Sequence, residues 1–182
     1  RLELIQQTGG EIKEIVRGLL DFARDTNDDQ QLVSAADIVH STLDLVRRTN
    51  AHKGVEFVER YPTDEVTVLG NVNQLKQLVL NLVANAREAM PNGGVVDVEV
   101  RRDGGDVVID VTDEGSGVPP ELVGRIFDPF FTTRRGRGGT GLGLPVSLGI
   151  AESHGGTLIV ATLPGRGGAT FSVRLPFEEG ER

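Results

Sequence analysis

Two asparagines and a glutamate occur at helical spacing within one segment of the sequence. At about 100° per residue, Asn81, Asn85 and Glu88 fall on a single polar strip that borders the apolar face. Asparagine is a weak helix former, so two of them four residues apart require a reason. One reason is structural, because buried amides can cap neighbouring backbone. The other is chemical, because a side-chain carbonyl oxygen suits magnesium, which shares its shell with water and phosphates.

A carboxylate and two glycines follow directly on a predicted strand. Residues 113–117 read DEGSG, after a strand predicted to end at Val111. An ionised aspartate only accepts hydrogen bonds, so Asp113 could accept one from an exocyclic amino group such as that of adenine. Gly115 and Gly117 would let the backbone approach a ligand closely. The alternative is an ordinary tight turn, in which Asp and Gly are common.

An aromatic cluster precedes a glycine-rich stretch. Three of the seven phenylalanines fall within residues 127–133, FDPFFTT, and five glycines lie between positions 136 and 143. An aromatic anchor followed by a flexible tether is the composition expected of a lid. Residues 139–144, GTGLGL, lead into a predicted helix, so their N–H groups could bind a phosphate chain. They match neither a Walker loop nor a dinucleotide-binding turn, and the alternative is a disordered surface loop.

The periodicity of apolar residues predicts the elements that would position these groups. The strongest helical pattern comprises Leu75, Leu78, Val79, Leu82, Val83 and Ala86. Pro91 and the two glycines after it end this helix. Other helices are predicted at 35–48 and 142–153, and strands at 55–59, 66–69, 96–100, 107–111, 157–162 and 170–175, with hairpin turns at 103–105 and 164–167. This order predicts an α+β fold with helices on one face of a mixed sheet.

The first residues carry a narrow apolar seam at alternating spacings of four and three. Its members are Ile5, Ile12, Ile15, Leu19 and Phe22, with Thr8 the only polar residue at a seam position. This pattern predicts a coiled-coil or bundle helix, the alternative being a helix packed on its own domain. The polar residues 27–31 are typical of a linker.

Composition restricts the classes of function. The 182 residues suffice for one domain plus an appendage, and 38% hydrophobic with 25% charged residues is typical of a soluble globular protein. No apolar run approaches the roughly 18 residues of a membrane span and no secretory leader is evident, so we expect no membrane contact. The lack of cysteine favours a reducing, cytoplasmic setting. A net charge of −8 disfavours nucleic-acid binding, although RRGRGG at 134–139 leaves an RNA-binding segment as a minor alternative.

Four segments together resemble the nucleotide site of the histidine kinase and gyrase-like ATPase superfamily, known as GHKL. They are, in order, NLVANAREAM, DEGSG, FDPFFTT and GGTGLGL. The tail HGGTLIVATLPGRGGATFSVRLP is also similar to the sensor histidine kinase branch. The resemblance covers about residues 35–177. It implies a two-layer sandwich of a mixed sheet on three helices, preceded by the bundle helix, and binding of ATP and Mg²⁺.

The resemblance also implies a role for each matching residue. Asn85 would be the magnesium ligand and Asp113 the carboxylate that reads adenine. Gly115 and Gly117 would shape the pocket floor, and Gly141, Leu142, Gly143 and Leu144 would bind the phosphates. Thr170 would lie near adenine, and Phe127 and Phe131 would anchor the lid. Val118 and Thr140 are the remaining nucleotide-binding positions. Arg134 stands where many relatives carry lysine, and either side chain can meet a terminal phosphate.

Asn81 separates two branches of this superfamily. The ATPase branch typically carries a water-activating glutamate four residues before the magnesium asparagine, and Asn81 occupies that position here. An amide cannot accept a proton at neutral pH, so hydrolysis lacks its usual base and phosphoryl transfer is favoured. Glu88, on the same strip, is a candidate stand-in base.

As a kinase of this branch, the protein would transfer the ATP γ-phosphoryl group to a histidine, for relay to a response-regulator receiver domain. The expected organisation is a second hairpin helix at 1–26, a linker at 27–34, an ATP-binding domain at 35–177 and a tail at 178–182, with hairpin helices forming a homodimer. His40, His52 and His154 lack the acidic residue that usually follows a phosphoacceptor, so we expect the acceptor outside this chain. The alternatives are a nucleotide-binding regulatory module without turnover and an anti-sigma-type serine kinase of the same fold.

Overall fold

The computed structural model describes residues 30–48, 54–134, 139–162 and 167–179. The predicted N-terminal helix, His52 and most of the turn at 164–167 lie outside these ranges. Along the chain the elements are β1 (Gln31–Ser34), α2 (Ala35–Arg48), β2 (Val55–Arg60), β3 (Thr67–Gly70), α3 (Val72–Ala89), β4 (Gly94–Asp103), β5 (Asp106–Asp113), the short 3-10 helix η2 (Pro120–Leu122), α4 (Gly143–Ser153), β6 (Thr157–Thr162) and β7 (Ala169–Pro176).

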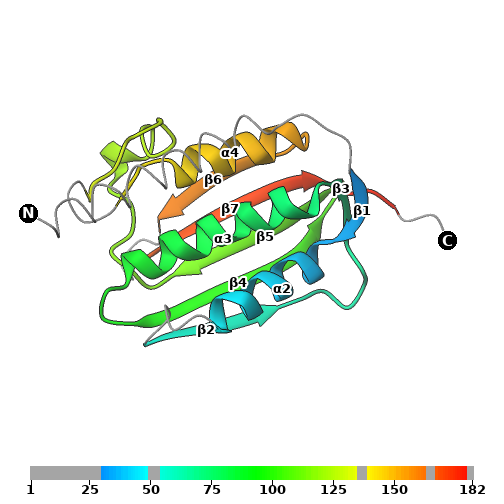
Figure 1. The fold of residues 1–182 in the computed structure, drawn as a ribbon, viewed down its shortest axis with the longest axis horizontal. Helices are drawn as coiled ribbons and strands as arrows, with labels where there is room; N and C mark the ends of the chain where they lie inside the picture. The colour runs from blue at the N-terminus through cyan, green and yellow to red at the C-terminus, as the bar shows by residue number, and fades with distance from the viewer. Residues whose placement is uncertain (1–29, 49–53, 135–138, 163–166, 180–182) are drawn as a thin grey trace, which may run out of the picture.

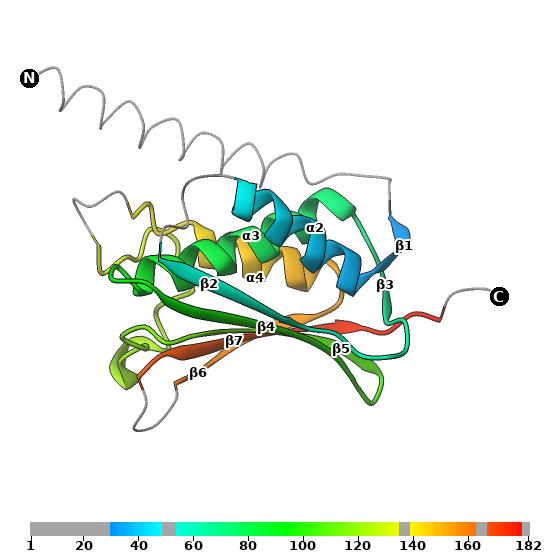
Figure 2. The same ribbon diagram turned by 90° about the horizontal axis from the view of Figure 1, so that it is seen from below.

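Five strands form the main sheet, in the order β2-β4-β5-β7-β6. The β2–β4 pair is parallel and the other pairs are antiparallel, so the sheet is mixed as predicted. Helices α2, α3 and α4 all lie on one face of it (Figures 1 and 2). The expected α+β sandwich of three helices on a mixed sheet is therefore confirmed.

A second, two-stranded sheet pairs β1 with β3 in antiparallel register. Strand β1 lies within the range assigned to the linker and was not predicted. Its four residues are too few to show alternation, and its partner strand begins more than thirty positions later at Thr67. Pairing over such a distance leaves no local signal in the sequence.

The core lies between the helices and the sheet, where alternate residues of β4 and β5 meet the apolar face of α3. The predicted helix face is entirely buried, from Leu75 to Ala86, and Val96, Val98 and Val100 are buried opposite it. The helix starts at the Asn71 cap, whose side chain accepts hydrogen bonds from the backbone N–H groups of residues 73 and 74. None of the helices in the described part of the chain combines the length and apolar character needed to cross a bilayer.

His154 joins the two helices that border the functional site. It caps the end of α4 and is buried, and its Nε2 accepts a hydrogen bond of 3.1 Å from the backbone N–H of Asn71 at the start of α3. Because that N–H can only donate, the ring proton belongs on Nδ1, which donates to the Ile150 carbonyl at 2.7 Å. No local pattern in the sequence reveals this link between helices, because Asn71 and His154 are 83 positions apart.

We expect His154→Ala to lower the free energy of unfolding by about 1–3 kcal/mol, because it leaves the Asn71 N–H unsatisfied and removes buried ring contacts. Urea unfolding followed by circular dichroism measures the change. His40→Ala is the matched control, since His40 is exposed and contacts Glu59 at the surface, and its effect should be much smaller. Equal stability of the two variants would contradict the assigned link.

Candidate functional site

A cavity of about 510 Å³ opens between α3, the segment after β5, the FDPFFTT segment and the start of α4. Twelve of the sixteen residues proposed from the sequence line it. They are Asn81, Asn85, Glu88, Asp113, Gly117, Val118, Phe131, Arg134, Thr140, Gly141, Gly143 and Leu144. Segments that are distant in the sequence thus form one site.

The other four predicted residues do not line the cavity. Gly115 packs on the end of α3, where a Cβ would come within 2.7 Å of the Ala89 side chain. Phe127 packs against the core, which suits an anchor, and Leu142 caps α4. The Thr170 hydroxyl meets that of Thr112 at 2.9 Å. These two threonines are cross-strand partners on β7 and β5.

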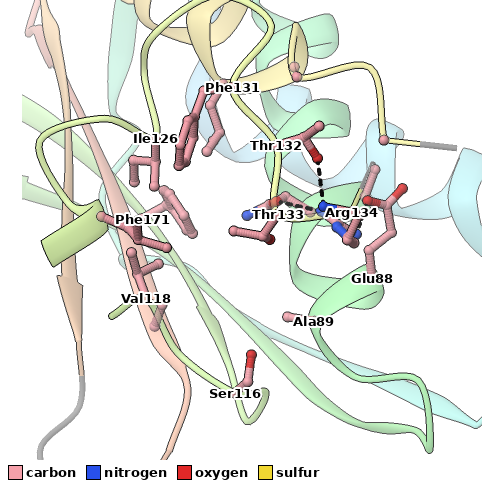
Figure 3. A pocket seen from close by; sticks show the side chains of 18 of the residues that line it. Glu88, Ala89, Ser116, Val118, Ile126, Phe131, Thr132, Thr133, Arg134 and Phe171 are labelled. Carbon is pink, nitrogen blue, oxygen red and sulfur yellow. Dashed lines mark hydrogen bonds and ion pairs between the residues drawn. The ribbon is translucent and has the colours of Figure 1, made fainter. Parts of the chain in front are cut away.

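The apolar wall of the cavity combines the predicted Val118 with Ile126, Ala169 and Phe171, which the sequence analysis missed. Ala169 and Phe171 line the cavity from β7, because side chains alternate along a strand and both neighbours of Thr170 face the helices. Val118, Ile126 and Phe171 gather on one side of the cavity in Figure 3. The alternation of Ala169, Phe171 and Val173 was the signal that could have identified the β7 residues.

Asp113 ends β5 and contributes a carboxylate beside this wall. It is only 2% exposed, and its Oδ1 accepts a hydrogen bond of 2.7 Å from the Gly115 N–H. Burial raises the pKa of the Asp113 carboxyl, although hydrogen bonds from the Gly115 and Ala169 backbone act in the opposite direction. A buried acceptor next to apolar side chains suits a flat, apolar ligand that carries an amino group.

Asn81 holds α3 to the first turn of α4. Its Oδ1 accepts from the Gln77 amide at 2.7 Å, and its Nδ2 lies 3.2 Å from the Gly143 carbonyl and 3.3 Å from Ser147 Oγ. The Asn81 contacts therefore fit the structural explanation of the asparagine pair, in which an amide side chain caps neighbouring backbone. One turn further along α3, Asn85 directs its oxygen to the FDPFFTT side of the cavity, where it meets Arg134.

Arg134 reaches from the end of the FDPFFTT segment to α3, where its guanidinium forms an ion pair with Glu88 (Figure 3). The same guanidinium donates to Asn85 Oδ1 at 3.3 Å. Its backbone N–H donates to Thr132 Oγ1 at 3.1 Å. Arg134 thus connects this segment to the polar strip of α3.

The glycine segment lies against the FDPFFTT segment and leads into α4. The Gly141 carbonyl accepts a hydrogen bond of 2.9 Å from the Phe130 N–H, and Gly141 adopts a φ of 68°. Helix α4 begins at Gly143, and residues 143–145 line the cavity. A helix N-terminus presents unpaired N–H groups and the positive end of its dipole, so this side of the cavity suits an anionic group.

Comparison with known proteins gives consistent matches. A family model described as "Histidine kinase-, DNA gyrase B-, and HSP90-like ATPase" matches residues 70–179. The signal transduction histidine-protein kinase AtoS of Escherichia coli is 35% identical over 166 residues, which are 91% of this chain and 27% of AtoS. The sensor histidine kinase ZraS of Salmonella typhimurium is 33% identical over 177 residues, which are 96% of this chain and 37% of ZraS. The chain thus spans well under half the length of these relatives.

Solved structures show the same fold. A mycobacterial sensor histidine kinase, MprB, superposes with a TM-score of 0.73 at 29% identity, covering 83% of this chain and 99% of that one. Full-length ShkA in complex with AMPPNP gives a TM-score of 0.82 at 26% identity, covering 99% of this chain and 39% of that one.

Proposed function

The chain belongs to the family of histidine kinase-, DNA gyrase B- and HSP90-like ATPases, and on this premise we propose that it is the ATP-binding catalytic domain of a sensor histidine kinase. In the complete protein it would donate the γ-phosphoryl group of ATP to a histidine. Its similarity along 91% and 96% of its length to two named sensor kinases supports this assignment.

The observation that carries the proposal is the cavity with two chemically different sides. Asp113 and an apolar wall form one side, and the α4 N-terminus, Asn85 and Arg134 form the other. A nucleoside triphosphate has the matching chemistry, with a flat base that carries an amino donor and a chain of anionic phosphates. We propose that Asp113 accepts a hydrogen bond from adenine and that Thr140, Gly141, Gly143 and Leu144 face the phosphates.

Asn85 is the proposed magnesium ligand. Asn85 lines the cavity, and its oxygen already accepts a hydrogen bond from a cationic side chain. Magnesium favours one or two protein ligands together with phosphates and water, so one amide oxygen beside the phosphate end fits its preference. When bound, the ion would neutralise charge on the phosphates, while this chain's residues hold the nucleotide in place.

Phosphoryl transfer is favoured over hydrolysis because Asn81 occupies the position of the water-activating glutamate. Both ends of its amide are engaged, with Gln77 on one side and the start of α4 on the other. We propose that Asn81 keeps α4 in position beside the phosphates. An amide cannot take a proton from water at neutral pH.

Several wider features are part of the proposal. Residues 1–26 would form the second helix of a dimerisation hairpin, residues 27–34 a linker, residues 35–177 the catalytic domain and residues 178–182 a tail. The full-length protein would act in the cytoplasm as a homodimer, and a response-regulator receiver domain would take the phosphoryl group from the phosphorylated histidine.

Calorimetry and radiolabelling test the proposal. We expect this chain to bind Mg-ATP, and EDTA to weaken that binding. In Asn85→Ala, we expect weaker binding that EDTA changes little, whereas Asn73→Ala, exposed on the first turn of the same helix, should behave like the wild type. Incubation with γ-labelled ATP should leave no stable label on this chain, and label should appear on a histidine supplied by an upstream helical hairpin.

Two results would contradict the proposal. Failure of the folded wild-type chain to bind ATP would exclude the assigned site. Stable label on His40, His52 or His154 would show that the acceptor is in this chain.

A further inference from the structure

Glu88 and Asn85 share one partner, the guanidinium of Arg134. Glu88 follows Asn85 by three residues on α3, so the two side chains lie on the same face of the helix. The planar guanidinium forms the ion pair with Glu88 through one nitrogen (Figure 3). Through the other terminal nitrogen it donates to Asn85 Oδ1 at 3.3 Å. Lysine would offer a single point charge in place of this planar fork.

The Asn85 contact is incompatible with the proposed metal site. The oxygen that accepts from Arg134 is the same atom that would bind magnesium. A guanidinium and a divalent cation on one oxygen would repel each other at close range. Arg134 must therefore leave Asn85 before Mg-nucleotide can bind there.

We propose that Glu88 is a positioning residue whose ion pair with Arg134 competes with Mg-nucleotide for the Asn85 site. The inference rests on the proposed function, because it assumes that Asn85 binds the metal. Binding of Mg-nucleotide exchanges the Arg134 contact for the metal and frees the guanidinium to meet a phosphate. The strength of the Glu88 pair then sets how much nucleotide affinity is lost to this exchange. In the nucleotide-free protein, the Glu88 carboxylate is thus the counterion of Arg134.

A double-mutant cycle tests the proposal, with Glu88→Gln, Arg134→Gln and the double variant. Mg-ADP is the probe, because it lacks the terminal phosphate that Arg134 would contact, and calorimetry at low ionic strength gives the affinities. Both side chains of the pair are partly exposed, at 33% for Arg134 and 43% for Glu88. We therefore expect Glu88→Gln to tighten Mg-ADP binding by about three- to fivefold, which is the range of a partly screened ion pair.

The double-mutant cycle distinguishes release of Arg134 from simple charge repulsion between Glu88 and the phosphates. Removing any negative charge near phosphates tightens binding, and that gain would persist without Arg134. We expect the gain from Glu88→Gln to fall below twofold in the Arg134→Gln background, since the two residues act as one unit. The matched control is Glu152→Gln, exposed on α4 and outside the cavity lining, which should leave the affinity unchanged.

Two outcomes overturn the inference. One is an equal gain from Glu88→Gln in both backgrounds, which identifies plain repulsion. The other is no gain in the wild-type background. Both leave the proposed function intact, because the wild type still binds Mg-nucleotide. Loss of binding in the wild type itself would instead reject the nucleotide site, and this inference with it.

Discussion

Asp113→Asn is expected to weaken ATP binding by about ten- to a hundredfold, the value of a hydrogen bond to a charged acceptor. The wild-type carboxylate only accepts hydrogen bonds, and it already receives one from the Gly115 N–H. An asparagine has one acceptor and one donor end, so its NH₂ group must face either a backbone N–H or the amino group of adenine. In both orientations two donors oppose each other.

The same substitution should not destabilise the fold. Burial raises the pKa of Asp113, so the folded state binds its proton more tightly than the unfolded chain does. The stabilisation from protonation is therefore present at acid pH and is lost as the pH rises through the folded-state pKa. At neutral pH the ionised carboxylate carries a burial penalty that asparagine lacks. We expect the free energy of unfolding at pH 7 to be unchanged or higher.

Calorimetry with Mg-ATP and urea unfolding as a function of pH measure both effects. Asp110→Asn is the matched control, because Asp110 lies on the same strand and pairs with Arg101. It should retain wild-type nucleotide affinity. If Asp113→Asn kept its affinity but lost stability, Asp113 would be a structural residue and the assigned adenine contact would be wrong.

Gly141→Ala is expected to lower ATP affinity by about five- to a hundredfold, since overpacking a close contact costs about 1–3 kcal/mol. The added Cβ would lie 2.6 Å from the Phe130 carbonyl carbon and 2.7 Å from the Phe131 oxygen. Both neighbours are backbone atoms, so no side chain can turn away. The glycine segment would have to separate from the FDPFFTT segment, and the cavity wall would open.

A control substitution at a second glycine separates the effect of this steric clash from the effect of backbone strain. Gly104 has a φ of 64°, close to the 68° of Gly141, but an added Cβ there meets nothing within 4 Å. Gly104→Ala therefore carries the same left-handed backbone cost without the contact. It lies in the turn between β4 and β5, and we expect it to keep wild-type ATP affinity. Equal affinities for the two alanine variants would show that the close approach of the two segments is unimportant for binding.

The sequence by itself determined the local elements and identified twelve of the residues that line the cavity. The helix pattern from Leu75 to Ala86 predicted both α3 and its buried face, because a period near 3.6 appears within a few turns. The alternating valines predicted β4 and β5, because the two-residue period of a strand is also visible within a short segment. The order of the four motifs predicted the nucleotide site, although each motif alone had an ordinary structural alternative.

Only the tertiary structure decided how distant segments meet. The β1–β3 pair and the His154–Asn71 hydrogen bond join residues far apart in the chain, for which no periodic signal exists. Strand β7 brought Ala169 and Phe171, and not Thr170, to the cavity, because a shift of one residue along a strand exchanges the two faces of the sheet. The contacts of Arg134 with Glu88 and Asn85 likewise depend on how one segment folds over another. Local periodicity specifies an element and its faces, whereas such contacts depend on packing between elements.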